Sequence, residues 1–425
     1  MLELAELSKI GFGCYRISRH AREHYQALSR ALVCGCNLID TAANYTNGDS
    51  EQVIGEVLAE HPEHDAFIIT KAGYVQGEAA TLHEELQRAG RACDGVVRTA
   101  GGWLHSIHPD FLDGQLTRSC HRLRRVQLDG FLLHNPEYYF DQVGPAPVQS
   151  EYYARLKQAF EFLEEAVAQG RVRYYGVSSN SLPCSSAAPR TTSLPRLLAL
   201  AAEVSTSHHF KLIEFPFNLI ENDAQVATHE GGLSLIEIAR TSGLVTLSNR
   251  PLNANSGNGP VRLATYEEEV QGLEESRDSR VLERCLQLVR RRLHELGSDD
   301  DVLEFAPLQI ISQSWSSFSD TDMVEQVFNQ HVWPFLDELY EGSIPPEVLQ
   351  AFTQLRQTVR LYAKRSMTIK ARQCRQQLIE QGLMAENDRR SLPLLACQSY
   401  LNAGIDHVLV GMRQPQYVDD LSSLF

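Results

Sequence analysis

The stretch "NLIDTAANYTNGDSEQVIGEVL", residues 37–58, contains a short apolar run, a polar turn and an amphipathic helical pattern. The run shows no alternation of polar and apolar side chains, which is typical of a strand buried on both faces of a parallel sheet. Asp40 ends this run, and Tyr45 follows in the turn. The residues "DSEQ" then give a capping pattern for a helix that begins at Asp49. The stretch therefore predicts a strand–helix unit with two polar side chains between its elements.

Segments of the same kind recur along the chain and alternate with helical patterns such as 20–35, 110–125 and 152–170. This alternation favours an α/β fold, a (β/α)8 TIM barrel, over an open doubly wound sheet. A dinucleotide-binding turn would support the open sheet, but "GFGCYR" at residues 11–16 lacks the third glycine of that turn. The eight predicted strands are residues 9–13, 37–41, 66–71, 130–134, 172–178, 211–215, 244–248 and 407–411.

The spacing of the strands breaks once, between the seventh and the eighth, where roughly 160 residues intervene and one barrel unit needs far fewer. We therefore expect residues 256–390 to form a helical insertion that does not fold independently, and residues 1–255 and 391–425 to form the barrel. The insertion follows "NANSGNGP", residues 253–260, which we interpret as a loop. Because it follows a strand end, it could wall the substrate pocket, cover a cofactor, form a homo-oligomer interface or be a peripheral appendage.

The insertion contains two apolar stripes at helical spacing, which we interpret as core. Pro345 and Pro346 come directly before the second stripe and predict the start of a helix there. The stripes consist of Leu282, Cys285, Leu286, Val289, Leu293 and Leu296, and of Val348, Leu349, Phe352, Leu355, Val359 and Tyr362.

The composition is that of an ordinary globular protein, with 43% hydrophobic and 22% charged residues. The formal net charge of −15 argues against a nucleic-acid binder, and no apolar stretch approaches the length of a membrane span. The N-terminus lacks the features of a secretory signal, so we expect a cytoplasmic protein. The nine cysteines include no Cys-x-x-Cys pair, and no metal site is predicted.

Four polar side chains fall at or just after the ends of predicted strands, where the active sites of such barrels gather. They are Asp40, Tyr45, Lys71 and His134. Each has a structural explanation when it is taken alone: a cap, a loop aromatic, a strand-end charge and a buried imidazole. As a set they suggest catalysis, because a lysine in a desolvated barrel mouth needs a partner and Asp40 is the natural one.

The same set suggests acid–base chemistry on a carbonyl group. A nearby ammonium favours the phenolate, so we expect Lys71 to lower the pKa of Tyr45 and make it a general acid near neutral pH. His134 could then hydrogen-bond and orient a carbonyl oxygen. The four groups together suit protonation of a developing alkoxide.

At these residues the chain resembles the aldo-keto reductase family, and the likeness covers residues 9–255 and 391–425, about two-thirds of the chain. The motifs that carry it are "DTAANYTNGDSEQVIGEVL" (40–58), "IITKAGY" (68–74), "FLLHNPE" (131–137), "YYGVSSNS" (174–181) and "HVLVGMRQPQYVDDL" (407–421). The resemblance implies NAD(P)H-dependent reduction of an aldehyde or ketone, or the reverse oxidation of an alcohol. By the same resemblance Tyr45 is the proton donor, Lys71 and Asp40 tune it, and His134 positions the carbonyl.

The resemblance also implies a cofactor site. Ser178, with either Ser179 or Asn180, matches the turn that holds the nicotinamide carboxamide. Gly411 and Arg413 match the phosphate-binding loop, and a guanidinium suits a 2′-phosphate, which favours NADP(H) over NAD(H).

Three positions near the cofactor depart from the family pattern. Glu214 stands where a glutamine usually contacts the nicotinamide amide, and a carboxylate can accept a hydrogen bond there but not donate one. Asn249 stands where an aromatic ring often stacks on the nicotinamide, with Arg250 expected on the phosphate side. Leu421 replaces an asparagine that commonly contacts adenine.

Two other functions stay open on the sequence alone. The departures above suit a nucleotide-binding barrel that regulates or binds a partner protein through its insertion, although the intact set of four polar residues argues against loss of catalysis. A lysine Schiff-base enzyme would need a neutral Lys71, which Asp40 disfavours. The expected ligand is therefore a small carbonyl or alcohol, and neither a nucleic acid nor a membrane.

Overall fold

The computed structural model describes residues 2–91, 95–144, 146–185, 188, 190–226, 229–256, 259–263, 265–267, 269–297, 301–380, 382 and 384–425. The chain divides into two compact units. The first is Met1–Pro251 with Leu394–Phe425, and the second is Leu252–Pro393.

The first unit is a closed barrel in which all neighbouring strands are parallel, and it confirms the predicted fold. Each predicted barrel strand is present, with ends that differ by one or two residues. Around the barrel the strands are β1 (Ile10–Gly13), β2 (Leu38–Asp40), β3 (Phe67–Ala72), β6 (Leu128–His134), β7 (Val172–Ser178), β8 (Phe210–Pro216), β9 (Val245–Asn249) and β12 (His407–Val410).

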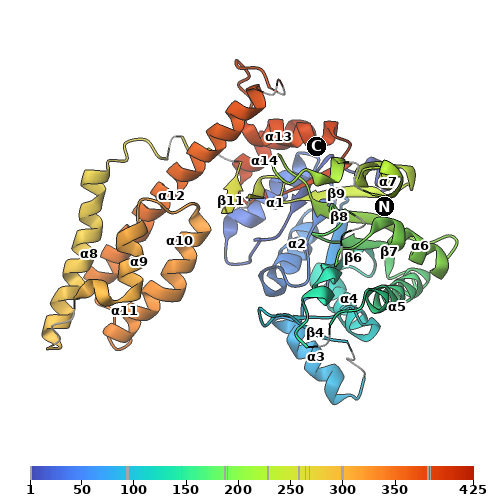
Figure 1. The fold of residues 1–425 in the computed structure, drawn as a ribbon, viewed down its shortest axis with the longest axis horizontal. Coiled ribbons are helices and arrows are strands. Elements are labelled where there is room, and N and C mark those ends of the chain that lie inside the picture. The colour runs from blue at the N-terminus through green and yellow to red at the C-terminus, as the bar shows by residue number, and fades with distance from the viewer. Residues whose placement is uncertain are drawn as a thin grey trace. The chain divides into compact units, whose positions relative to one another are not determined.

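Helices lie around these strands and cover the apolar outer face of the barrel (Figure 1). Close packing brings β7 and β8 together at Gly176, where any Cβ atom would lie 1.8 Å from the carbonyl oxygen of Leu212. The helices of this unit are α1 (Arg22–Val33), α2 (Asp49–Glu60), α3 (Glu78–Arg88), α4 (Pro109–Leu123), α5 (Gln149–Ala168), α6 (Leu194–Val204), α7 (Leu235–Thr241), α13 (Leu392–Asn402) and α14 (Pro415–Leu421).

The barrel interior has an apolar layer with a polar layer directly above it. Side chains two residues apart on a strand face the same side, so each apolar position sets the position of the next inward group. The apolar layer includes Leu38, Ile69, Leu132, Leu212 and Leu247. Two residues further along the same five strands stand Asp40, Lys71, His134, Glu214 and Asn249.

Two short antiparallel pairs were not predicted. One joins β4 (Val97–Arg98) to β5 (Leu104–His105) after α3. The other joins β10 (Asn253–Ser256) to β11 (Gly259–Arg262), so the interpretation of residues 253–260 as a loop is wrong. The physical reason is that asparagine and glycine also favour the tight turns of hairpins, which lets the flanking residues pair.

The second unit is helical and has a hydrophobic core of its own, to which both predicted stripes contribute. Two stripe residues are instead largely exposed: Leu296, which ends α8, and Leu349, in the first turns of α12. None of the helices that the structure describes is both long and apolar enough to cross a membrane. The helices of this unit are α8 (Glu275–Glu295), α9 (Ala306–Ser314), α10 (Thr321–Val327), α11 (Trp333–Leu339) and α12 (Pro346–Glu380).

Candidate active site

Lys71 lies at the centre of the polar layer and is fully buried. Its ammonium donates a hydrogen bond to Asp40 Oδ1 at 2.5 Å and another to the carbonyl oxygen of Thr41 at 3.0 Å. The ammonium nitrogen is 5.2 Å from the centre of the Tyr45 ring, and the centres of the Tyr45 and His134 rings are 5.9 Å apart. The four predicted catalytic groups therefore meet at the carboxyl ends of the strands.

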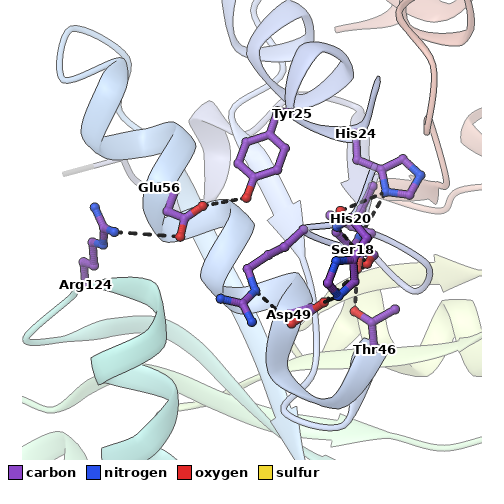
Figure 2. A network of polar contacts seen from close by, with 10 residues as sticks. Ser18, His20, His24, Tyr25, Thr46, Asp49, Glu56 and Arg124 are labelled. Atoms are coloured by element: carbon purple, nitrogen blue, oxygen red, sulfur yellow. Dashed lines mark hydrogen bonds and ion pairs between the residues drawn. The ribbon is translucent and has the colours of Figure 1, made fainter. Parts of the chain in front are cut away.

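Tyr45 is held by a short 3-10 turn, Tyr45–Gly48, in which Thr46 and the next two residues all have positive φ angles. The loop after β1 braces this turn (Figure 2). The Thr46 hydroxyl donates to the carbonyl oxygen of Ile17, and the Ser18 hydroxyl donates to Asp49 Oδ2 at 3.3 Å. Two separate loops thus fix the backbone that presents the phenol.

Helix α2 begins at Asp49 as predicted, but the predicted cap is wrong, because Gly48 takes the N-cap position and no side chain caps the helix. The Asp49 carboxylate instead binds the loop after β1. In the same first turn Glu51 is fully buried, and its Oε2 lies 2.6 Å from the guanidinium of Arg122 in α4. The Glu51–Arg122 pair therefore ties α2 to α4 directly behind the Tyr45 turn.

Glu214 is a second carboxylate on Lys71, which the sequence did not predict. Its Oε2 lies 3.1 Å from the Lys71 ammonium, and its Oε1 accepts a hydrogen bond from Asn249 Nδ2 at 2.9 Å. Both Glu214 and Asp40 are buried. One ammonium is therefore shared by two carboxylates. This contact could have been predicted from the spacing on the strand, because Glu214 lies two residues after Leu212 and therefore faces the same side of the sheet.

The shared ammonium changes the acid–base properties of the site. Burial and the charge of Glu214 raise the pKa of Asp40 from 3.8 to about 8, although Lys71 lowers it. Burial also raises the pKa of Tyr45. Lys71 lowers this pKa as expected, but the two carboxylates add to the effect of burial, so the pKa is raised and not lowered overall. The physical reason is that two carboxylates offset one ammonium while desolvation disfavours the phenolate. Tyr45 is thus a neutral phenol that can donate its proton.

His134 is buried and neutral. Burial, together with the charge of Lys71, holds its pKa well below the usual value, and its Nδ1 has no hydrogen-bond partner in the described part of the chain. His105 fixes the backbone of His134, because an imidazole nitrogen of His105 lies 2.7 Å from the His134 carbonyl oxygen. A Cβ atom on Gly73 would come within 2.5 Å of both residues. A neutral imidazole in this place can donate a hydrogen bond to a carbonyl oxygen.

The predicted carboxamide turn lies beside these groups. Ser178 pairs in register with His134 on one side and with Glu214 on the other. The Ser179 hydroxyl is fully buried and bonds Thr192, whereas the Asn180 side chain is exposed and donates to Asn135 Oδ1 at 3.2 Å. The structure therefore brings Ser178 and Asn180 to the barrel mouth and turns Ser179 away from it.

A half-buried acid supports this turn. Glu137 accepts a hydrogen bond from the backbone nitrogen of Asn180 at 2.7 Å, and burial raises the pKa of Glu137 to about 7. The sequence analysis did not single out this residue, because nothing in a local pattern reports a contact across forty residues.

The remaining predicted cofactor residues are spread along the rim. Asn249 points its amide nitrogen at Glu214, while its Oδ1 is buried without a partner among the described residues. The Arg250 guanidinium is paired with Glu221 at 2.6 Å. Gly411 is exposed and directly follows β12. Burial lowers the pKa of His24, and the positive charge of Arg413 adds to this effect. Contact of these residues with a phosphate stays a prediction.

The comparison with known proteins agrees with this geometry. Residues 9–210 match the model of the aldo/keto reductase family. Residues 9–210 are therefore similar to an aldo/keto reductase domain. The match ends at the start of β8, so Glu214 and Asn249 lie beyond it.

The curated relatives are distant and are matched only in part. The chain is 24% identical over 174 residues to the uncharacterized oxidoreductase YqkF of Bacillus subtilis (strain 168), which covers 41% of this chain and 45% of that protein. It is 23% identical over 146 residues to the NADH-specific methylglyoxal reductase of Escherichia coli (strain K12), which covers 34% of this chain and 38% of that protein. The chain thus spans less than half the length of these relatives.

A solved structure supports the fold. The glycerol dehydrogenase of Gluconobacter oxydans aligns with 99% of this chain and 86% of its own chain, with a TM-score of 0.50 and 16% identity. At this identity the likeness shows the fold alone.

The aldo-keto reductase fold implies a nicotinamide cofactor, and groups at the barrel mouth fit one. A carboxamide both donates and accepts hydrogen bonds. The buried, unpartnered Oδ1 of Asn249 can accept from it, and the exposed amide of Asn180 and the hydroxyl of Ser178 can bond its oxygen. These donors and acceptors surround the same rim as Tyr45.

A cleft of about 480 Å³ opens next to the candidate site. Tyr138 lines it and also contacts Tyr74, whose ring centre is 4.8 Å from that of His134. The next residue, Tyr139, is buried and stacks on Tyr152. The cleft is lined by Thr99, Ala100, Gly101, Trp103, Tyr138, Phe140, Asp141, Gln142 and Arg190.

One group of side chains among the described residues could hold a metal ion, in the exposed loop between α2 and β3. It consists of His61, Glu63 and His64. This loop lies at the amino ends of the strands, away from the site above, and the absence of a catalytic metal stays a prediction.

Proposed function

We propose that this protein is an NAD(P)-dependent oxidoreductase that interconverts an aldehyde or ketone and an alcohol by hydride transfer, with Tyr45 as the proton donor. The observation that carries the proposal is the meeting of the Tyr45, Lys71, Asp40 and His134 side chains at one rim of the barrel. The similarity of residues 9–210 to an aldo/keto reductase domain supports it.

Each side chain has a role that follows from its state. The bound nicotinamide would supply or accept the hydride. His134, as a neutral donor, orients the carbonyl oxygen and polarises it. Tyr45 donates its phenolic proton to the same oxygen as negative charge develops there, and Lys71 stabilises the phenolate that remains. Asp40 holds the ammonium of Lys71 in place through the 2.5 Å hydrogen bond.

The cofactor form depends on a different residue, Arg413, and is proposed separately. A guanidinium binds phosphate in a bidentate manner, and Arg413 on the loop after β12 is the group that favours NADP(H) over NAD(H). Titration of the protein with NADPH and NADH, followed by quenching of protein fluorescence, tests this preference. Tighter binding of NADH, with Arg413→Ala leaving both affinities unchanged, contradicts it.

Replacement of Tyr45 by phenylalanine tests the catalytic role. A general acid contributes roughly 10²- to 10⁴-fold to a rate, so Tyr45→Phe is expected to lower the rate of NADPH oxidation with a generic aldehyde by at least about a hundredfold. Binding of NADPH is expected to persist, because the phenol does not hold the cofactor. Tyr25→Phe removes a hydroxyl that bonds Glu56 outside the site and serves as the matched control.

Two outcomes would contradict the proposal. Equal rates for the wild type and Tyr45→Phe would remove Tyr45 from the mechanism. Tight NADPH binding without oxidation across a broad panel of aldehydes and ketones would favour the alternative of a nucleotide-binding protein that regulates a partner.

A further inference from the structure

The ion cluster at the centre of the site has an unbalanced charge. Lys71 contributes one positive charge, and Asp40 and Glu214 contribute two negative charges when both are ionised. The Lys71 side chain is 0% exposed, that of Asp40 is 6% exposed and that of Glu214 is 2% exposed. Water therefore screens the excess negative charge poorly.

No other group in contact with the cluster balances this charge. Lys71 is the one cation that is paired with either carboxylate in the described part of the chain. Asn249 donates a neutral amide hydrogen to Glu214. His134 is held neutral, and burial raises the pKa of the neighbouring Cys14 thiol well above its usual value, so that it stays neutral as well.

A buried cluster with an excess negative charge binds either a proton or a cation. The raised pKa of Asp40, about 8, reflects the first possibility. The second is met by the oxidised nicotinamide ring, which carries a positive charge, whereas the reduced ring is neutral. The ring has to lie within reach of the carbon whose oxygen Tyr45 protonates, and Lys71 lies directly behind Tyr45.

We propose that Glu214 is a specificity-determining residue that makes this site bind the oxidised nicotinamide in preference to the reduced one. This inference rests on the proposed oxidoreductase function. When the proposed reaction runs from the oxidised cofactor, the alcohol carbon gives up a hydride and its hydroxyl gives up a proton. The products are a carbonyl compound, the reduced cofactor and one proton, which leaves through Tyr45 to solvent.

The contact between Asn249 and Glu214 keeps the carboxylate in this place. Its 2.9 Å hydrogen bond takes one carboxylate oxygen and leaves the other against Lys71. A glutamine at position 214 would have the same shape without the charge. Glu214→Gln therefore isolates the effect of the charge from that of packing.

The test compares the dissociation constants of the oxidised and reduced cofactors, measured by calorimetric titration at pH 9, above the pKa of about 8 of Asp40. NADP⁺ and NADPH are the first probes, and NAD⁺ and NADH are the second. At an effective dielectric constant near 20 a unit charge a few ångströms away changes binding by about tenfold or more. Glu214→Gln is therefore expected to weaken NADP⁺ binding about tenfold or more and to change NADPH binding by less than about threefold.

The control is Glu203→Gln, which removes one negative charge from the exposed side of α6, where Glu203 pairs with Lys157. It is expected to leave the ratio of the two dissociation constants unchanged. Equal effects of Glu214→Gln on both cofactor forms, or an equal change of the ratio in Glu203→Gln, would overturn the inference.

The wild type gives a second reading that does not depend on the folding of a variant. The wild-type protein is expected to bind NADP⁺ more tightly than NADPH at pH 9. Tighter binding of NADPH would overturn the inference. Turnover of a generic aldehyde keeps the two proposals apart. If the wild type reduces the aldehyde but shows no preference for NADP⁺, only the proposed role of Glu214 is contradicted. If the wild type binds no nicotinamide cofactor, the proposed function is contradicted as well.

Discussion

At the scale of single residues, the environment of Lys71 determines the chemistry of its neighbours. One ammonium with a single carboxylate would form an ion pair with no net charge beside Tyr45. Burial raises the pKa of Tyr45, and the charges of Asp40 and Glu214, which share the one ammonium, add to this effect. Tyr45 is therefore better suited to give a proton than to exist as a phenolate in the resting protein.

The raised pKa of Asp40 predicts how stability depends on pH. An unfolded aspartate loses its proton near pH 3.8, whereas the folded site keeps it up to about pH 8. Between these values the folded state binds the extra proton, so this group stabilises the fold fully below pH 3.8, and its contribution is lost as pH rises through 8. In Glu214→Gln the pKa of Asp40 is expected to fall, because a main cause of the shift is removed.

Urea unfolding at pH 5.5, 7 and 8.5 measures this effect as a difference between two proteins. The wild type is expected to lose stability relative to Glu214→Gln as the pH rises. Parallel pH profiles of the two proteins would show that no proton is shared between the carboxylates.

The sequence allowed the pairing of Lys71 with Asp40 to be predicted, because adjacent parallel strands bring their ends together. It did not allow the contact with Glu214 to be predicted, because that contact crosses the barrel from β3 to β8. The expected direction of the Tyr45 pKa shift was wrong for the same reason. A single neighbouring charge was weighed without the second carboxylate and without the depth of burial.

At the scale of elements, the first turn of α2 is the support of the site. Glu51 is buried, and it accepts hydrogen bonds from both Thr70 in β3, at 2.5 Å, and Arg122 in α4, at 2.6 Å. Arg122 also lies against Gly48, the last residue of the Tyr45 turn. One ion pair therefore joins a strand, two helices and the turn that carries the phenol.

Removal of Glu51 is expected to be costly. Glu51→Ala leaves the buried Arg122 with Glu78 as its remaining acidic partner, and loss of one member of a buried pair costs about 3 kcal/mol or more. Urea unfolding measures the loss. The matched control is Glu85→Ala, whose partner Arg118 is more exposed, and surface pairs of this kind contribute about 1 kcal/mol or less. Equal costs for the two variants would show that the buried pair does not support α2.

Elements were predictable where a periodic pattern was long enough. The barrel strands appear in the sequence as buried apolar runs, and the stripes of α8 and α12 have helical spacing. The pair of β4 and β5 has two residues in each strand and so has no pattern to detect. Leu296 and Leu349 fit their stripes by spacing but lie near helix ends, where the apolar face is no longer covered.

At the scale of the whole molecule, the chain consists of a barrel interrupted by a helical unit. The chain leaves the barrel after Pro251 and returns at Leu394. The Tyr400 hydroxyl donates a hydrogen bond to the carbonyl oxygen of Pro251 at 3.0 Å, so the chain ends on either side of the interruption lie close together.

This proximity predicts that the barrel tolerates excision of residues 252–393. A short glycine–serine linker from Pro251 to Leu394 is expected to give a barrel that melts cooperatively and keeps the circular dichroism of an α/β protein. Loss of the melting transition would show that the insertion is part of the folding unit. The predicted roles of the insertion, in a substrate wall, a cofactor cover or a homo-oligomer, are tested by turnover and sedimentation of the same variant.

The sequence indicates an interruption at residues 256–390 because the spacing between the seventh and eighth strands is too long for one barrel unit, and the compact second unit is Leu252–Pro393. That the insertion does not fold independently stays a prediction. The function of the inserted unit was not predictable, because its apolar stripes report packing within the unit and carry no chemistry.

The two stacked layers inside the barrel have a consequence for mutation by insertion or deletion. Asp40, Lys71, His134 and Glu214 each lie two positions beyond a core leucine or isoleucine on the same strand. Deletion of a single residue within β2, β3, β6 or β8 would move every following side chain of that strand to the opposite face. An outward-facing side chain would then take the place of the reactive one. Reading-frame-preserving deletions of one residue in these four segments should therefore abolish activity even where the protein still accumulates in the cell.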